Sequence, residues 1–449
     1  MSVATTNHIA PENVHETLRQ SILADGMDMV MDLEKSKGAR VYDQLHQREL
    51  LDFFTCFATI PLGYNHPKML SDEAFKEDLL EAALINPANS DIYTTQYADF
   101  VSVFNRVCKR DYLTHAFFIN SGGLAIENAM KVAMDWKVQK NFKKGYRHEV
   151  GHQIMHFEQA FHGRTGYTMS VTNTDPTKTK YFAQFDWPRV TNPKIHFPLT
   201  PEKQEALEQH EQLAIAQMKR HFHERKDHIA AVLIEPIQGE GGDNHFRKEF
   251  FEQVRAVCDE NDAMLIYDEV QMGMACTGEF WAHEHFGPNA RPDIIAFAKK
   301  MQVSGILAGP KVDEVETNVF NVSSRINSTW GGQLVDMVRI RKILEIYEED
   351  KVIENVRESG AHLLNRLHEL QEQHPEAISN VRGRGLICAF DLPDQHTRDH
   401  FVKHGWDQGV MFLGASTHTI RFRPTLTITK AEIDHGMDVA DSVLKQMGH

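Results

Sequence analysis

Cysteine is scarce in this sequence, and its spacing excludes the structures that depend on it. The 449 residues include five cysteines, which are scattered, odd in number and never spaced as Cys-x-x-Cys. Such a pattern fits neither a disulfide framework nor a zinc site, whereas it fits the reduced thiols of a cytoplasmic protein. We therefore predict no metal from the cysteines and expect a cytoplasmic location.

Long apolar runs and an excess of basic residues are also missing. The polar N-terminus, MSVATTNHIAPENVHE, has no apolar segment of the kind that a secretory signal needs, and no run is long enough to span a bilayer. The formal net charge of −15 argues against a general nucleic-acid-binding surface. We therefore expect neither a membrane nor a nucleic acid as a partner.

Short apolar runs alternate with helical patterns through the middle of the chain. The runs are His115–Ile119, Gln153–Phe157, Ala230–Ile234, Met264–Tyr267 and Ile294–Phe297. Helical patterns such as Pro201–Glu224 and Lys248–Glu260 lie between them. This alternation predicts an α/β fold with a mostly parallel sheet, whose ligand crevice lies at the carboxyl ends of the strands.

The pattern changes towards both ends, so we predict three regions. Residues 1–70 form an N-terminal segment, residues 71–335 a large domain, and residues 336–449 a smaller α+β domain in which long helical stretches precede short extended pieces. At the start of the last helix, Thr429 and Glu432 have the spacing of a capping box.

Ionisable side chains follow three of the short runs. Glu235 ends one run, Asp268 ends the next, and the adjacent lysines Lys299 and Lys300 end the third. The small turn Ser121-Gly122-Gly123 before a helix could expose N–H groups to a phosphate. Each feature alone is more simply a solvated strand end or a tight turn, but together they indicate one site.

A lysine, a carboxylate and a phosphate-binding turn in one crevice suit pyridoxal phosphate. A lysine amine whose pKa is lowered by burial can form a Schiff base, and a carboxylate can keep a pyridine nitrogen protonated. Phe161 follows another strand and could stack on the ring. Because neighbouring strand residues point to opposite faces, only one of the two lysines should face the crevice.

Ordered motifs along the chain carry a family resemblance. They are LIYDEVQMG, FAKKMQVSG, FHGRTGYT, EPIQGEGG, NSTWGG, RGRGL and IRFRPTLTIT. With them the chain resembles class III (subgroup II) pyridoxal-phosphate aminotransferases of fold type I, from about Gly63 to the C-terminus. The resemblance implies pyridoxal 5'-phosphate as cofactor and a homodimer with shared active sites.

The resemblance also implies catalytic roles. Lys300, placed before a turn at Ser304-Gly305, is expected to be the Schiff-base lysine and the base, with Lys299 facing away. Asp268 is expected to pair with the pyridine nitrogen. The other expected cofactor contacts are Ser121, Gly122 and Gly123 for the phosphate, Phe161 and Val270 for the ring faces, Gln271 for the phenolic oxygen, and Thr329 for the phosphate of the neighbouring subunit.

Within the family, the segments NTDPTKTKYFAQFDWPR, GEGGDNHFRKEFF and STWGGQLVDMVR most resemble transaminases that act on the ε-amino group of L-lysine. The implied ping-pong reaction passes this group to 2-oxoglutarate and yields 2-aminoadipate 6-semialdehyde and L-glutamate. Arg164 would bind the distal carboxylate of both substrates. Arg421 would bind the carboxylate beside the reacting carbon of glutamate, and Glu240 would pair with Arg421 when lysine is bound.

Some assignments stay open at this point. Gln271 and Asn327 are further expected substrate contacts, and Arg423 could partly replace Arg421. His221 with His223, and His283 with His285, have metal-ligand spacing but are interpreted as surface histidines. Alternative functions are an ω-aminotransferase for ornithine, 4-aminobutyrate or a diamine, a pyridoxal-phosphate aminomutase or decarboxylase, and a non-catalytic binding protein.

Overall fold

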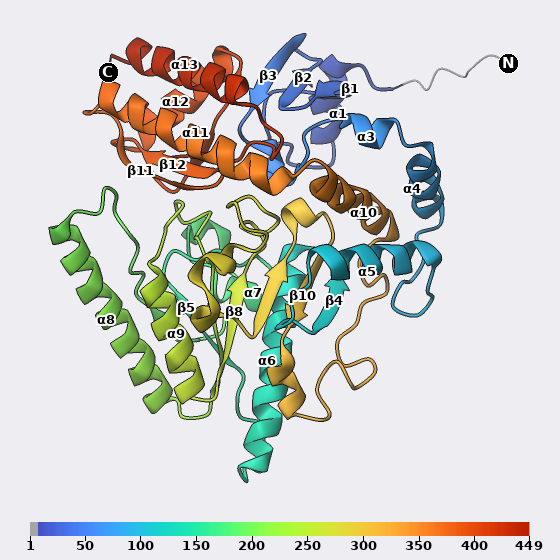
Figure 1. Ribbon diagram of the computed structural model, residues 1–449, viewed down its shortest axis with the longest axis vertical. Helices are drawn as coiled ribbons and strands as arrows, with labels where there is room; N and C mark the ends of the chain where they lie inside the picture. Colours follow the sequence, from blue (N-terminus) through green and yellow to red (C-terminus); the bar gives the residue numbers. More distant parts are fainter. Residues whose placement is uncertain (1–7, 449) are drawn as a thin grey trace.

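Seven strands form the central sheet of the larger half of the molecule (Figure 1), in the order β4-β10-β9-β8-β7-β5-β6. The strands are β4 (His115–Ile119), β5 (Gln153–Phe157), β6 (Arg189–Val190), β7 (Ile229–Ile234), β8 (Met264–Asp268), β9 (Ile294–Phe297) and β10 (Ser304–Ala308). Within residues 8–448, which the computed structural model describes, only β10 runs antiparallel to its neighbours in this sheet. The predicted mostly parallel sheet is therefore confirmed.

Strand β10 corrects the turn that was expected at Ser304-Gly305. These residues open a strand that pairs with both β4 and β9. A Cβ atom on Gly305 would come within 2.3 Å of the Phe117 carbonyl oxygen, so the glycine serves a close approach between strands. The same small residues are typical of turns, which is why the sequence pattern misled.

Helices cover both faces of this sheet, because alternate strand residues point to opposite sides. On one face, α6 (Gly122–Lys143) shares a core with Ile266 and Ala296. On the other face, Tyr267 and Phe297 share a core with residues of three further helices. These are α5 (Thr95–Val107), α8 (Pro201–Glu224) and α9 (Lys248–Glu260). The bounds of α8 and α9 are those predicted.

Strands β1–β3 and the C-terminal helices lie together in the upper part of Figure 1. One antiparallel sheet, in the order β11-β12-β15-β14, contains β11 (Ser379–Arg384), β12 (Ile387–Asp391), β14 (Leu413–Ala415) and β15 (Thr419–Phe422). A second sheet combines β1 (Met31–Lys37), β2 (Arg40–Asp43) and β3 (Arg48–Asp52) with β13 (Val410–Met411), which pairs in parallel with β3. The N-terminal segment and the C-terminal region therefore share a sheet.

Nine further α-helices complete the described structure. They are α1 (Val14–Arg19), α2 (Thr55–Ala58), α3 (Pro67–Leu70), α4 (Glu73–Ile85), α7 (Gly166–Met169), α10 (Leu334–Glu349), α11 (Val352–Gln373), α12 (Gln395–Asp407) and α13 (Lys430–Gln446). Helix α10 packs against α4 and α5. The predicted capping box opens α13, where Glu432 N donates to Thr429 Oγ1 at 3.3 Å. Across the described residues, no helix combines the length and apolar character needed to cross a membrane.

Candidate active site

A cavity of about 550 Å³ opens where the carboxyl ends of β7, β8 and β9 meet the N-terminus of α6. Parallel strands deliver their following residues to the same edge of a sheet, so motifs far apart in sequence meet here. Among the predicted site residues, those that line the cavity are Ser121, Gly122, Gly123, Phe161, Glu240, Asp268, Val270 and Gln271.

The N-terminus of α6 provides an anion-binding surface. The helix begins at Gly122, directly after Ser121, whose φ is 80°. A Cβ atom on Gly122 would lie 2.9 Å from Val270 Cγ1, so a side chain does not fit between the helix and the end of β8. The free N–H groups and the positive end of the helix dipole favour a bound phosphate.

Asp268 lies at the bottom of the cavity and is 5% exposed. Its Oδ2 lies 2.8 Å from His162 Nδ1, and its Oδ1 accepts a hydrogen bond from Val270 N at 3.0 Å. These two contacts fix the direction of the carboxylate. Sequence reasoning missed His162, although it directly follows Phe161 in one of the motifs that carry the family resemblance.

Glu235, at the end of β7, holds two segments of the cavity wall. Its Oε1 accepts a hydrogen bond from Phe161 N, and its Oε2 accepts one from Gly239 N, both at 3.0 Å. Burial, reinforced by the charge of Asp268, raises the pKa of Glu235 to about 7. The carboxyl group therefore positions the backbone on both sides of the cavity, a role that the sequence did not reveal.

The two adjacent lysines point in opposite directions, as predicted, but the structure reverses which of them faces the cavity. Lys299 lines the cavity. Lys300 is 2% exposed, and its Nζ donates a hydrogen bond to the Ala58 carbonyl oxygen at 3.1 Å. The reason is local: the pair lies in a 3-10 turn rather than on a strand, and Lys299 has a φ of 37°. The chain thus turns before the pair, and the first lysine faces the crevice.

The pKa values of the two amines do not distinguish them, but their surroundings do. Burial lowers the pKa of Lys299 and of Lys300 to about 8. The charges of Arg421 and Asp268 act on Lys299. Arg423 acts on both amines, whereas Cys276 acts on Lys300 alone. Of the two amines, only Lys299 is therefore coupled to the carboxylate at the bottom of the cavity.

Lys300 supports a strained turn that borders the cavity. The four residues from Thr55 to Ala58 all have positive φ values, between 42° and 68°. This left-handed conformation costs an L-residue about 1–2 kcal/mol. Lys300 binds the carbonyl of Ala58, and Gln302 Nε2 donates to the carbonyl of Thr59 at 3.2 Å. These bonds tie the strained turn to the segment that carries Lys299.

Arg421, on β15, forms the predicted pair with Glu240. It is 1% exposed, and its Nη2 donates a hydrogen bond to Glu240 Oε2 at 2.9 Å. Its Nε and Nη1 are buried without a hydrogen-bond partner among the described residues. Burial, together with the charge of Arg423, lowers the pKa of Arg421 despite the attraction of Glu240. Unused N–H groups on a buried guanidinium can bind a carboxylate.

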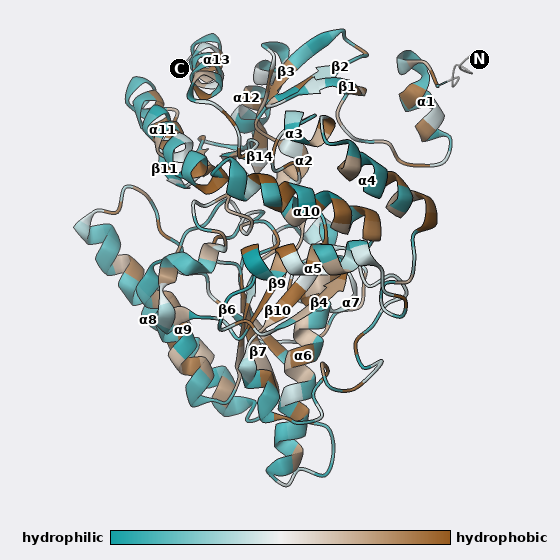
Figure 2. Cartoon of the chain, turned by 45° about the vertical axis from the view of Figure 1, so that its right-hand side comes forward, coloured by the Kyte–Doolittle hydropathy of each residue, from teal (hydrophilic) through white to brown (hydrophobic). Residues whose placement is uncertain are grey.

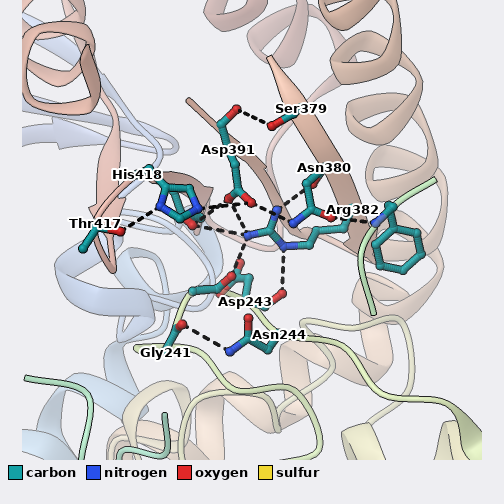
Figure 3. A network of polar contacts seen from close by, with 12 residues as sticks. Gly241, Asp243, Asn244, Ser379, Asn380, Arg382, Asp391, Thr417 and His418 are labelled. Atoms are coloured by element: carbon teal, nitrogen blue, oxygen red, sulfur yellow. Dashed lines mark hydrogen bonds and ion pairs between the residues drawn. The ribbon is translucent and has the colours of Figure 1, made fainter. Parts of the chain in front are cut away.

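Two more arginines hold the loop of residues 239–244, which carries Glu240. Arg382, on β11, links this loop to β12 (Figure 3): its Nη2 donates to Gly242 O at 2.6 Å and to Asp391 Oδ1 at 2.8 Å. Arg423 Nη1 donates to Asp243 Oδ2 at 2.9 Å. Because Arg423 is ion-paired with Asp243, it is not free to replace Arg421, contrary to the expectation from sequence.

The comparison with protein families agrees with this geometry. Residues 22–444 match the family model described as aminotransferase class-III. The chain belongs to this family. An L-lysine-epsilon aminotransferase of Mycobacterium bovis is 46% identical to this class III aminotransferase over 434 residues, which cover 97% of this chain and 96% of that protein.

Two further relatives extend this similarity. The L-lysine-epsilon aminotransferase of Streptomyces clavuligerus is 43% identical over 433 residues, which cover 96% of this chain and 94% of that protein. A solved structure of the lysine aminotransferase from M. tuberculosis has a TM-score of 0.95 and 46% identity, and the match covers 98% of this chain and 100% of that chain.

The cavity of this aminotransferase fits pyridoxal phosphate. The N-terminus of α6 suits the phosphate, and the buried carboxylate of Asp268 suits a protonated ring nitrogen. Phe161 and Val270 offer apolar surface for a ring, and Lys299 offers an amine. The volume lies within the range of small-molecule sites, about 300–1,000 Å³.

Besides Lys300 and Arg421, three further predicted residues lie outside the cavity lining in a single chain of the aminotransferase. Arg164 is exposed, with its guanidinium 5.9 Å from the centre of the Phe161 ring. Asn327 and Thr329 are exposed on a loop, where Ser90 Oγ donates a hydrogen bond to the Thr329 carbonyl oxygen at 3.2 Å. The predicted roles of these residues stay predictions.

The histidine pairs require one correction. His283 is not a surface residue: it is 1% exposed, its Nδ1 lies 2.9 Å from Glu269 Oε1, and its Nε2 lies 2.9 Å from the Tyr112 hydroxyl. The charged local sequence concealed this role, because Glu269 reaches His283 from the end of β8. Within residues 8–448 we find no group of three or more His, Cys, Asp or Glu side chains that could hold a metal ion.

Proposed function

We propose that this aminotransferase transfers the ε-amino group of L-lysine to 2-oxoglutarate and forms 2-aminoadipate 6-semialdehyde and L-glutamate. The 43–46% identity to L-lysine-epsilon aminotransferases supports lysine as the donor. The observation that carries the proposal is the ion pair between the buried Arg421 and the half-buried Glu240, whose charges both act on Lys299. Lysine has a methylene group beside its reacting carbon, whereas 2-oxoglutarate has a carboxylate there. An arginine that Glu240 pairs with for one substrate and releases for the other suits both lysine and 2-oxoglutarate.

The side chains of the cavity have distinct roles in this reaction. When bound, pyridoxal phosphate supplies a carbonyl that takes up the amino group and a cationic ring that withdraws electrons. Lys299 Nζ would hold the cofactor and then move a proton to and from the reacting carbon of the substrate, in place of the Lys300 expected from sequence. Asp268 would hold a proton at the ring nitrogen. The N–H groups at Gly122 and Gly123 would bind the phosphate.

Glu240 and Arg421 would handle the difference between the two substrates. With lysine bound, Glu240 stays on Arg421, because a buried guanidinium without a partner is costly. With 2-oxoglutarate bound, Glu240 moves aside and the 1-carboxylate takes its place. Arg164, at the edge of the cavity beside Phe161, is proposed to bind the distal carboxylate of either substrate.

Replacing Glu240 with alanine should slow the lysine half-reaction about tenfold more than the 2-oxoglutarate half-reaction. The reason is that Arg421 then lacks a partner only when lysine is bound. Stopped-flow absorbance of each half-reaction measures the two rates separately. Glu240→Gln is the matched control, since it keeps the size of the side chain without its charge and should give the same direction of change. Equal slowing of both half-reactions would contradict the gate.

The test of the proposed function is the fate of a labelled nitrogen. The holoenzyme is incubated with lysine labelled with ¹⁵N at the ε position and with 2-oxoglutarate, and the glutamate is analysed by mass spectrometry. We expect labelled glutamate, and no label from lysine labelled at the α position. Glutamate labelled only from the α-amino group would overturn the proposal.

The alternative functions are separated in the same experiment. Ornithine, 4-aminobutyrate and a diamine replace lysine as donors, and lysine should give the highest kcat/KM. A higher value for another donor would identify a different ω-aminotransferase. Release of carbon dioxide, or turnover without a keto acid, would identify a decarboxylase or an aminomutase. Neither of those activities needs an arginine that is covered for one substrate and uncovered for the other.

We further propose that the active enzyme is a homodimer with shared sites. Large apolar side chains are exposed at the end of α4 and in the segment that follows it, where Ile85 and Tyr93 are each 77% exposed (Figure 2). This segment contacts the loop of Thr329 through Ser90. An exposed apolar surface of this kind is typical of an interface. Sedimentation should give twice the 51.4 kDa of one chain, and a fully active monomer would contradict the proposal.

A further inference from the structure

A third charged side chain joins the Glu240–Arg421 pair. Lys178, which precedes a turn between α7 and β6, places its Nζ 2.6 Å from Glu240 Oε1. The side chain is only 15% exposed. Its Nζ also lies 5.3 Å from the centre of the ring of Phe161, which lines the cavity. Neither the motifs nor the proposed reaction assigns Lys178 a role.

The three charges form a row in which each oxygen of Glu240 has its own cation. Lys178 contacts Oε1, and Arg421 contacts Oε2 at 2.9 Å. Burial raises the pKa of Glu240, but the two cations outweigh it and lower the pKa below its usual value. The row therefore carries one excess positive charge. The neighbouring Arg423–Asp243 pair is neutral in itself and does not offset this charge.

The excess charge changes which substrate the row prefers. Without Lys178, Glu240 and Arg421 would be neutral together, and an incoming carboxylate would leave the group with a net negative charge. With Lys178, the added carboxylate makes the row neutral: it pairs with Arg421 while Glu240 keeps Lys178. Removing one partner of a buried ion pair is costly when the other charge is left alone. Lys178 prevents that cost when Glu240 leaves Arg421.

We propose that Lys178 is a specificity-determining residue that favours the dicarboxylate substrate by keeping Glu240 paired after it leaves Arg421. This inference rests on the proposed function. Lys178 stabilises Glu240 more when it is the only partner of this carboxylate than when Arg421 also binds it. Lys178 therefore favours binding in the acceptor half-reaction. It has little effect on a donor that lacks a carboxylate beside the reacting carbon.

The test measures binding to the holoenzyme rather than turnover. Isothermal titration calorimetry gives the Kd of glutarate, a dicarboxylate that cannot react, and of pentanoate, which has one carboxylate and a similar length. In Lys178→Met, the Kd of glutarate should rise about tenfold and that of pentanoate less than about threefold, in line with usual coupling between charged sites. Lys178→Arg should restore glutarate binding. Lys180→Met, which alters an exposed lysine close by with no ion pair among the described residues, should change neither value.

A second background separates action through Glu240 from direct contact with the ligand. In Glu240→Gln, Lys178→Met should change the Kd of glutarate less than about threefold, because no carboxylate remains to be kept paired. A tenfold change in that background would overturn the inference, and so would equal weakening of glutarate and pentanoate or an unchanged glutarate Kd. If labelled lysine instead fails to pass its ε-nitrogen to glutamate, the proposed function fails independently of these binding constants.

Discussion

Lys299→Ala should lose at least about 10³-fold in turnover, as expected for a group that serves as both nucleophile and base. Lys299 is the lysine that lines the cavity and lies within the electrostatic influence of Asp268. The direct measurement is borohydride reduction of the holoenzyme, digestion and peptide mapping. We expect a pyridoxyl label on Lys299 in the unaltered enzyme and no label in Lys299→Ala.

Lys300→Met is the matched control for this prediction. The neighbouring side chain is 2% exposed and points to the Ala58 carbonyl, so its loss should affect the left-handed turn rather than the reacting groups. The label should persist in Lys300→Met, and turnover should fall by much less than in Lys299→Ala. A label on Lys300, or its loss only in Lys300→Met, would restore the assignment made from the sequence and contradict the geometry.

Asp268→Asn should lower kcat by about 10²–10³-fold, the usual range for a group that holds a proton at a reacting site. Asparagine can keep the backbone hydrogen bond from Val270 but carries no charge to stabilise a protonated ring nitrogen. The pair with His162 would also lose its ionic partner. Steady-state kinetics with lysine and 2-oxoglutarate measure the effect, and the absorbance of the bound cofactor reports whether the ring has changed its protonation.

Asp268→Glu provides the comparison that separates charge from shape. It keeps the carboxylate at the bottom of the cavity but lengthens the side chain, so it should retain more activity than Asp268→Asn. A cofactor-loaded Asp268→Asn enzyme within tenfold of the unaltered one would show that the carboxylate does not control the ring. Because Asp268 is only 5% exposed, either substitution could destabilise the fold. Thermal unfolding of both variants checks that the loss of activity does not come from unfolding.

Much of the large domain could be predicted from local sequence. The runs that became β7, β8 and β9 are continuous and apolar, as expected of strands buried on both faces. The helices α8 and α9 have their predicted bounds. By contrast, β6 is a two-residue strand and β10 opens with Ser304-Gly305, so neither carries enough local signal. Their pairing with other strands is what makes them strands.

Most residues of the cavity were also within reach of the sequence. Asp268 and Glu240 follow strands of a parallel sheet, and the rule that such ends meet at one edge is sufficient to bring them together. The sequence marked Glu235 as a strand-end carboxylate but did not reveal its role, and it did not mark His162 or Lys178. These roles consist of contacts with residues 62 to 106 positions away. No local pattern marks a side chain whose function is to hold another.

By itself, the sequence determined the parallel sheet, the glycines that start α6 and the carboxylates that end β7 and β8. Short-range patterns of apolar residues are sufficient to predict these features. Only the tertiary structure decided which lysine enters the cavity. That choice depends on a 3-10 turn at Lys299 and on a carbonyl of Ala58, 242 residues away, that binds the other amine. Two identical neighbouring side chains differ in function only through the partners that folding brings to them.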